Sequence, residues 1–301
     1  MSKQDKLSDQ RWELLVERIE RQEFVPFIGA EECSNGVPTS SEIARDWASR
    51  YRYPLRDGDE DLARVAQFIV IDASDEHCAH KRLASRLKAI KLDSSLADEP
   101  HGLLARLPLA IYVTTNYHSL LTQALRAAKR DVHEGWCRWN IDKARNRSEQ
   151  SNSSYAPTVA SPYVFHLFGS VEYPDALVLT EDNYLDFLIR ISEDRELIPS
   201  WIQEAVASYS LLFIGYHPRD FEFRVLLRCL RRQLELYQHF RLSVSIDVVT
   251  RSTAKPEMEQ ALRAYLDRYC QSLKIHVHWE SPRAFLRQLH DRCVQKGLVL
   301  W

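Results

Sequence analysis

The sequence of 301 residues contains no apolar run that approaches the roughly 18 residues of a membrane-spanning helix. Its first residues, Met1 to Lys6, are mostly polar and lack the apolar segment of a secretory signal peptide. We therefore expect a cytoplasmic protein that does not contact a membrane.

Neither sign of charge is in excess. Forty Lys and Arg side chains stand against 42 Asp and Glu side chains, for a formal net charge of −2. This balance argues against a protein that binds nucleic acid directly by electrostatics. The six cysteines are scattered and no two form a Cys-x-x-Cys pair, so we expect no four-cysteine zinc site and no metal.

Glycine is scarce, and its spacing excludes several nucleotide-binding and hydrolase motifs. No two of the eight glycines are separated by a single residue, so the G-x-G-x-x-G dinucleotide fingerprint is absent. The G-x-x-x-x-G-K-[ST] phosphate loop and the G-x-S-x-G nucleophile elbow are also missing. A nucleotide site, if present, must be built in another way.

What the chain does have is a series of short apolar runs. Their apolar residues fall on both faces, which is typical of strands inside a parallel sheet. The runs cover residues 24–30, 109–115, 163–168, 210–216, 243–250 and 274–279.

Helical patterns separate these runs. Thr39 and Glu42 fit a capping box that opens a helix towards Arg50, and residues 261–269 and 282–294 also predict helices. The alternation predicts an α/β fold, a Rossmann-like doubly wound parallel sheet of about six strands with a helical lobe inserted after the first strand. We expect a single domain over residues 1–301, with its core in residues 24–57 and 106–301 and the helical lobe in residues 58–105.

Four segments with polar or glycine residues follow predicted strands at their carboxyl ends, where open α/β sheets bind ligands. They are Phe27 to Ser34 with Pro38 to Ala44, Tyr112 to Tyr117, Val164 to Ser170 running on to Tyr184, and Leu211 to Tyr216 with Asp220.

In order and spacing, these segments resemble the sirtuin-like superfamily, especially its zinc-less bacterial branch in antiphage defence. That family reads G-A-G-x-S, then T-T-N-Y-D, then K-L-H-G, then G-Y/F-S, and the resemblance spans residues 24–295. It implies a Rossmann-like domain that binds NAD as its substrate and a helical lobe that closes over it. Members of this branch resemble NAD glycohydrolases, which release nicotinamide and deplete cellular NAD.

The resemblance also implies roles for individual residues. Asn116 stands at the position of the Asn that holds the ribose hydroxyls and the attacking water, and His166 is the candidate general base. The residues expected to bind NAD are Gly29, Ala30, Cys33, Thr115, Gly169, Gly215, Tyr216 and His217.

The sequence departs from the family pattern near the pyrophosphate and near the base. Glu31 replaces the second glycine of the turn and Glu32 lies beside it, so two carboxylates oppose phosphate binding. Phe168 replaces the family histidine before Gly169. His166 lies two residues earlier, which by strand periodicity puts it on the same face.

Two further histidines offer rival proton acceptors. His118 replaces the Asp that follows T-T-N-Y, and His217 replaces the Ser that follows Gly215 and Tyr216. Both follow predicted strands at the edge where Asn116 lies.

Three functional hypotheses remain open. The first is an NAD-hydrolysing effector of bacterial antiphage defence; the second is a catalytically silent subunit that binds a nucleotide or acts as a scaffold. The third is a protein deacylase or ADP-ribosyl transferase, of which deacylation is disfavoured by the missing zinc cysteines. Because a toxic NAD hydrolase needs restraint, we also expect a homo-oligomer or a separate regulatory or sensor subunit.

Overall fold

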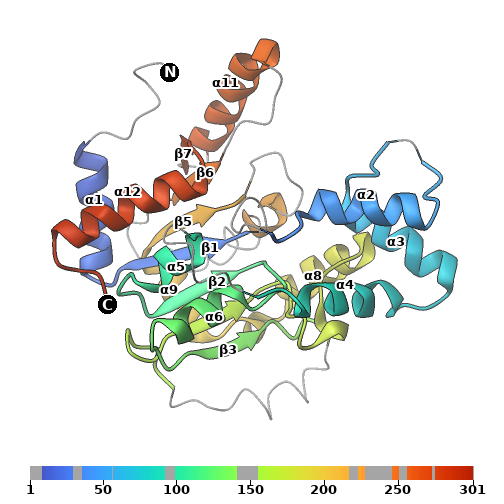
Figure 1. Ribbon diagram of the computed structural model, residues 1–301, viewed down its shortest axis with the longest axis horizontal. Helices are drawn as coiled ribbons and strands as arrows, with labels where there is room; N and C mark the ends of the chain where they lie inside the picture. Colours follow the sequence, from blue (N-terminus) through green and yellow to red (C-terminus); the bar gives the residue numbers. More distant parts are fainter. Residues whose placement is uncertain are drawn as a thin grey trace.

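A parallel sheet forms the centre of the protein in the computed structural model (Figure 1). The structure describes residues 9–29, 36–55, 57–91, 99–140, 155–216, 223–227, 246–250, 256–272 and 275–300. Its seven strands run in the order β3-β4-β2-β1-β5-β6-β7, and all neighbouring strands pair in parallel. They are β1 (Phe24–Ile28), β2 (Ile111–Thr114), β3 (His133–Trp136), β4 (Tyr163–His166), β5 (Ser210–Ile214), β6 (Ile246–Thr250) and β7 (Ile275–Trp279).

The predicted α/β, Rossmann-like fold is confirmed. All six predicted strands are present, and β3 is an additional strand at one edge of the sheet. The sheet order changes direction around β1, which pairs with β2 on one side and with β5 on the other. In open sheets of this kind, ligands bind beyond the carboxyl ends of the strands at such a point.

Side chains alternate between the two faces of each strand, and the central strands are apolar at successive positions. Both faces of the sheet are therefore apolar. Phe27, Val113 and Phe213 pack into a core on one face, while Ile28 and Tyr112 pack into a second core on the other. The first core is covered by α8 (Glu181–Glu193) and α9 (Ser200–Ser208), with a contribution from α11 (Pro256–Ser272). The second is covered by α1 (Asp9–Glu20), α5 (Pro100–Ala105), α6 (Leu120–Ala127) and α12 (Pro282–Gln295).

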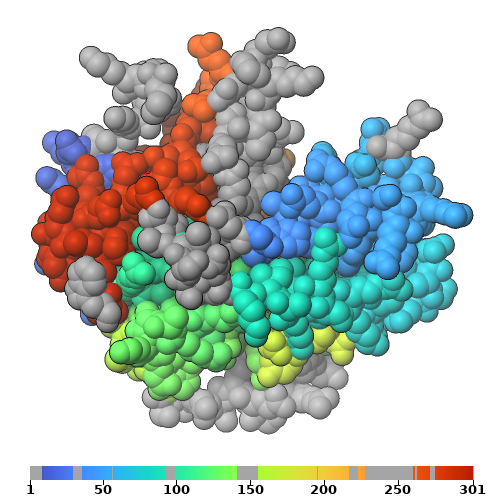
Figure 2. All heavy atoms as spheres, viewed as in Figure 1, coloured from blue at the N-terminus to red at the C-terminus, as the bar shows by residue number. Residues whose placement is uncertain are grey.

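A third core lies among α2 (Ser40–Arg50), α3 (Leu62–Ala73) and α4 (Cys78–Lys88). Figure 2 shows the blue-to-teal residues of these helices gathered to one side of the molecule. The predicted capping box is present at the start of α2, where Thr39 and Glu42 exchange hydrogen bonds. Leu177 and Leu179, which follow β4, complete this third core and join the helices to the sheet.

Two short 3-10 helices, η1 (Pro174–Ala176) and η2 (Arg195–Leu197), and a helical stretch at residues 223–227 are also present. Within the residues that the structure describes, no helix is both long and apolar enough to cross a lipid bilayer.

Candidate functional site

The carboxyl ends of β1, β2 and β5 meet at one edge of the sheet. The Gly29 N–H donates to the Ile214 carbonyl over 2.8 Å, and the Thr115 N–H donates to the Ile28 carbonyl over 3.0 Å. Because β1 lies between β2 and β5, these bonds bring three of the four sequence segments together. Gly29, Thr115, Gly215 and Tyr216 therefore lie side by side at the ends of these strands.

Gly29 must be a glycine for this close approach. A Cβ at that position would lie 2.5 Å from the Gly215 carbonyl oxygen and 3.0 Å from the ring of Tyr216. Gly215 itself has a φ of +75°, a backbone conformation that favours glycine. The two glycines let β1 and β5 end in contact.

Asn116 follows directly and is buried, with 3% of its surface exposed. Its backbone N–H donates to the Thr114 hydroxyl over 3.0 Å, while the side-chain Oδ1 has no hydrogen-bond partner. A buried amide oxygen without a partner is costly, by about 1–3 kcal/mol. Such an atom is therefore an available acceptor for a donor group of a ligand or for water.

Asn116 lines a cavity of about 30 Å³ between the sheet edge and the helices α2–α4. This volume holds roughly one water molecule. The wall on the sheet side is polar and the opposite wall is mostly apolar. The lining includes Thr115, Asn116 and His118 on one side and Ile43, Leu62 and Leu83 on the other.

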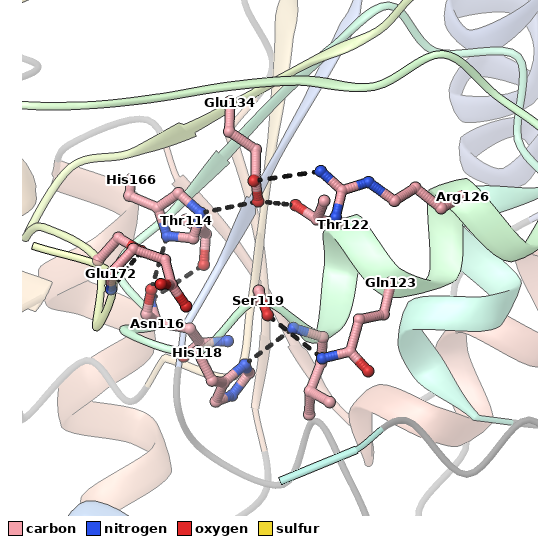
Figure 3. Close-up of polar contacts among 12 residues, drawn as sticks. Thr114, Asn116, His118, Ser119, Thr122, Gln123, Arg126, Glu134, His166 and Glu172 are labelled. Carbon is pink, nitrogen blue, oxygen red and sulfur yellow. Dashed lines mark hydrogen bonds and ion pairs between the residues drawn. The ribbon is translucent and has the colours of Figure 1, made fainter. Parts of the chain in front are cut away.

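His166 lies at the end of β4, buried beside Asn116 (Figure 3). Its ring Nδ1 lies 3.0 Å from the main-chain carbonyl oxygen of Asn116. Its Nε2 faces the Oε1 of Glu134, a residue of β3, at 3.8 Å. The two predicted catalytic residues, Asn116 and His166, are thus in direct contact, and Glu134, which no motif in the sequence indicated, lies beside His166.

His118 lines the same cavity and is also buried. Burial, together with the neighbouring rings of His101 and His166, lowers the pKa of His118 to about 3. The Nδ1 of the ring accepts the Leu120 N–H over 3.5 Å, so Nε2 carries the proton of the neutral ring. A neutral ring of this kind is a poor proton acceptor and a suitable hydrogen-bond donor.

Phe168 does not face this site. Its ring is buried in the core, edge-on to Tyr184 and Phe187. The expectation that Phe168 and His166 share a strand face is wrong, because β4 ends at His166 and strand alternation stops there. Gly169, with a φ of +87°, turns the chain so tightly that a Cβ would lie 2.4 Å from the Ala176 carbonyl oxygen.

Several predicted site residues lie outside the described residues: Ala30, Cys33 and His217, and with them Glu31 and Glu32. Among the residues that are described, no group of three or more His, Cys, Asp or Glu side chains could hold a metal ion.

The parallel sheet, with an asparagine, histidines and close-packed glycines at its carboxyl edge, defines an α/β protein of the Rossmann-like class. The chain belongs to the SIR2-like family: a SIR2-like domain is recognised over residues 110–273, more than half of the sequence. This confirms the sirtuin-like resemblance.

Two curated relatives carry the name NAD(+) hydrolase ThsA. The protein from Acinetobacter baumannii is 26% identical over 229 residues, which cover 74% of this chain and 42% of the relative. The protein from Cytobacillus dafuensis is 27% identical over 175 residues, or 57% of this chain and 30% of the relative. The chain is thus similar to less than half the length of either relative.

Proposed function

We propose that this protein hydrolyses NAD to nicotinamide and ADP-ribose. One observation carries the proposal: the side-chain oxygen of Asn116 is buried at the carboxyl edge of the sheet, lines a cavity and lacks a hydrogen-bond partner. The names of the two curated relatives support the same reaction.

In the proposed reaction the bond between the ribose C1′ and the nicotinamide nitrogen breaks, and its electron pair stays on nicotinamide. Water adds to the oxocarbenium-like C1′ and gives up one proton. Asn116 holds the ribose hydroxyls and this water through its amide. His166 accepts the proton at a ring nitrogen, in line with its contact to Asn116.

The rest of the proposed NAD site follows the strand ends. Gly29 and Gly215 leave room for the dinucleotide to approach the backbone, and the hydroxyl pair of Thr115 and Tyr216 offers hydrogen bonds. Gly169 lies on the turn after β4. Ala30, Cys33 and His217 remain proposed NAD-binding residues on the basis of the sequence, and the helical lobe of residues 58–105 is proposed to close over NAD.

The test is release of nicotinamide from NAD by the purified protein, alone and with candidate nucleotides and partner proteins. Asn116→Ala and His166→Ala serve as the inactive comparisons. Nicotinamide release by the wild-type protein that is lost in Asn116→Ala supports the proposal. Absence of nicotinamide under every condition rejects it.

One observation favours a second candidate function, a catalytically silent subunit that binds a nucleotide or acts as a scaffold. The residue before Gly169 is Phe168, whose ring is committed to the core and offers no proton acceptor. This alternative predicts that NAD binds, as measured by calorimetry, and is recovered intact after prolonged incubation.

We further propose that the protein acts in bacterial antiphage defence by depleting NAD, and that oligomerisation or a regulatory subunit restrains it. The resemblance to defence sirtuins motivates this role. Expression in phage-infected cells, with NAD measured against time, tests it, and the solution mass of the purified protein tests the oligomer. A constitutively active monomer contradicts the proposed restraint.

A further inference from the structure

We propose that Glu134 is the positioning residue of His166: its carboxylate fixes the imidazole and stabilises the imidazolium that forms during the reaction. The catalytic role of Glu134 in this inference rests on the proposed function. The arrangement of the two side chains, however, can be tested without any substrate.

The contacts of His166 determine where its hydrogen lies. Its Nδ1 is 3.0 Å from the carbonyl oxygen of Asn116, and a carbonyl oxygen can only accept a hydrogen bond. Nδ1 therefore carries a hydrogen and donates it. The lone pair of the neutral ring is left on Nε2, which is buried, has no hydrogen-bond partner and faces Glu134 at 3.8 Å.

Glu134 is itself held in place. The hydroxyl of Thr122, on α6, donates to its Oε1, and the guanidinium of Arg126 lies 3.6 Å from its Oε2 (Figure 3). Burial raises the pKa of Glu134, but the contacts with His166, Thr122 and Arg126 together outweigh it, so the pKa lies below its usual value. The carboxylate is ionised at neutral pH.

The other titratable groups around the pair do not replace this carboxylate. His118 is neutral at pH 7 because its pKa is about 3, and it interacts with His166 only as a second ring. Arg126 lies on the far side of Glu134 and remains positively charged. Glu172, which Figure 3 also draws, pairs with Lys88 at 3.2 Å, and the ion pair given for His166 is with Glu134.

The proton balance of the step follows. As water attacks C1′, one of its protons passes to Nε2 of His166, while nicotinamide leaves with the electron pair of the broken bond. The ring becomes an imidazolium with hydrogens on both nitrogens, and both then face oxygen atoms. Glu134 stays ionised and stabilises the new charge at Nε2, the nitrogen that has taken the proton; in Ser-His-Asp hydrolases, by contrast, the buried acid contacts the ring nitrogen that does not take the proton.

The decisive variant is Glu134→Gln, which keeps the size of the side chain and an oxygen that can accept from Thr122. Glu17→Gln makes the same chemical change on the surface of α1, where Glu17 pairs with Arg21. We expect Glu134→Gln to lower kcat for nicotinamide release about 100-fold with KM nearly unchanged, and Glu17→Gln to leave both unchanged.

The pH profile separates positioning from simple loss of structure. Without the carboxylate the imidazolium is less stable, so the acidic limb of kcat against pH moves to lower pH in Glu134→Gln. A merely structural role would lower activity without moving this limb. Wild-type kcat and an unmoved limb in Glu134→Gln would overturn the inference, as would full activity of His166→Ala.

A second readout needs no NAD. In protein labelled with ¹⁵N-histidine, the ring signals of His166, assigned by their loss in His166→Gln, are followed against pH. We expect the imidazolium form to persist to higher pH in the wild-type protein than in Glu134→Gln. Identical titrations of the two proteins reject the role of Glu134. A wild-type protein that never releases nicotinamide rejects the proposed function, and the titration then still tests whether Glu134 interacts with His166.

Discussion

The hydroxyl oxygens of Thr115 and Tyr216 lie 3.0 Å apart, joining the residues that follow β2 and β5 across the end of β1. Both side chains are buried, and the Tyr216 ring also packs on Phe213 and Phe223. The hydroxyl pair therefore closes the edge of the sheet where Asn116 lies.

This hydrogen bond should be measurable as a coupling energy. We expect Tyr216→Phe and Thr115→Val each to lower the free energy of unfolding by about 1 kcal/mol, because each removes the hydrogen bond between the two buried hydroxyls. The double variant should lose less than the sum of the two. Urea unfolding of the four proteins gives the coupling, and strict additivity would show that the pair does not interact.

Replacement of Asn116 by Ala should separate function from stability. The side-chain oxygen makes no hydrogen bond in the folded protein, so its loss removes no native hydrogen bond of that atom. We expect at least a 100-fold loss of nicotinamide release with the free energy of unfolding within about 1 kcal/mol of wild type.

The matched control for Asn116→Ala is Asn140→Ala, at an exposed residue whose amide donates to the Asp175 carbonyl. This variant should keep full activity. Equal losses of activity in the two variants would argue against a specific role of Asn116.

Glycine at position 29 is required by space. An added Cβ would lie 2.5 Å from the Gly215 carbonyl oxygen, which is backbone and cannot move away without shifting β5. We expect Gly29→Ala to lower the free energy of unfolding by about 1–3 kcal/mol.

Gly102→Ala is the comparison, since its Cβ would meet only Glu99 at 3.7 Å within the helix α5. That change should be neutral or stabilising by up to about 1 kcal/mol because alanine favours helices. Thermal unfolding of both variants tests the contrast, and equal stabilities would contradict it.

The strands that build the site could be predicted because they are apolar on both faces. Phe24–Ile28 and Ser210–Ile214 are buried along their whole length, and such runs are distinct in sequence. The polar residues directly after them could be placed at one edge for the same reason. The position of Asn116 followed from this pattern together with the T-T-N-Y motif.

Glu134 could not be found in this way. It lies on β3, whose sequence His-Glu-Gly-Trp has no apolar run, because an edge strand is only partly buried and tolerates polar residues. Gly135 in this strand leaves room for Tyr163, since a Cβ there would lie 2.0 Å from the tyrosine hydroxyl oxygen. Gly135 and Tyr163 lie on the neighbouring strands β3 and β4, two positions out of register, and one sequence does not reveal a contact of this kind.

The orientation of Phe168 also depends on tertiary structure. Strand periodicity put it beside His166, but the chain leaves the sheet at His166 and turns at Gly169. The rings of Tyr184 and Phe187, on α8, then receive the Phe168 side chain. Where a strand ends decides which face the next residues take.

His118 should make the stability of the protein depend on pH. Its pKa is about 3 in the folded protein, because burial and the rings of His101 and His166 oppose its charge, against 6.5 in an unfolded chain. Below pH 6.5 the unfolded chain therefore binds a proton on His118, whereas the folded protein binds this proton only near pH 3. Stability from this group is fully present above pH 6.5 and falls as the pH decreases, by about 2 kcal/mol at pH 5.

The variant His118→Asn removes the titrating ring and keeps a side-chain acceptor near the Leu120 N–H. Between pH 7.5 and pH 5 the free energy of unfolding should fall in both proteins, and the fall in His118→Asn should be about 2 kcal/mol smaller than in the wild type. His133→Asn, at a ring that is 47% exposed, should follow the wild type. Urea unfolding at the two pH values measures all three proteins, and parallel losses in wild type and His118→Asn would mean that the folded protein accepts the proton on His118 as readily as the unfolded chain does.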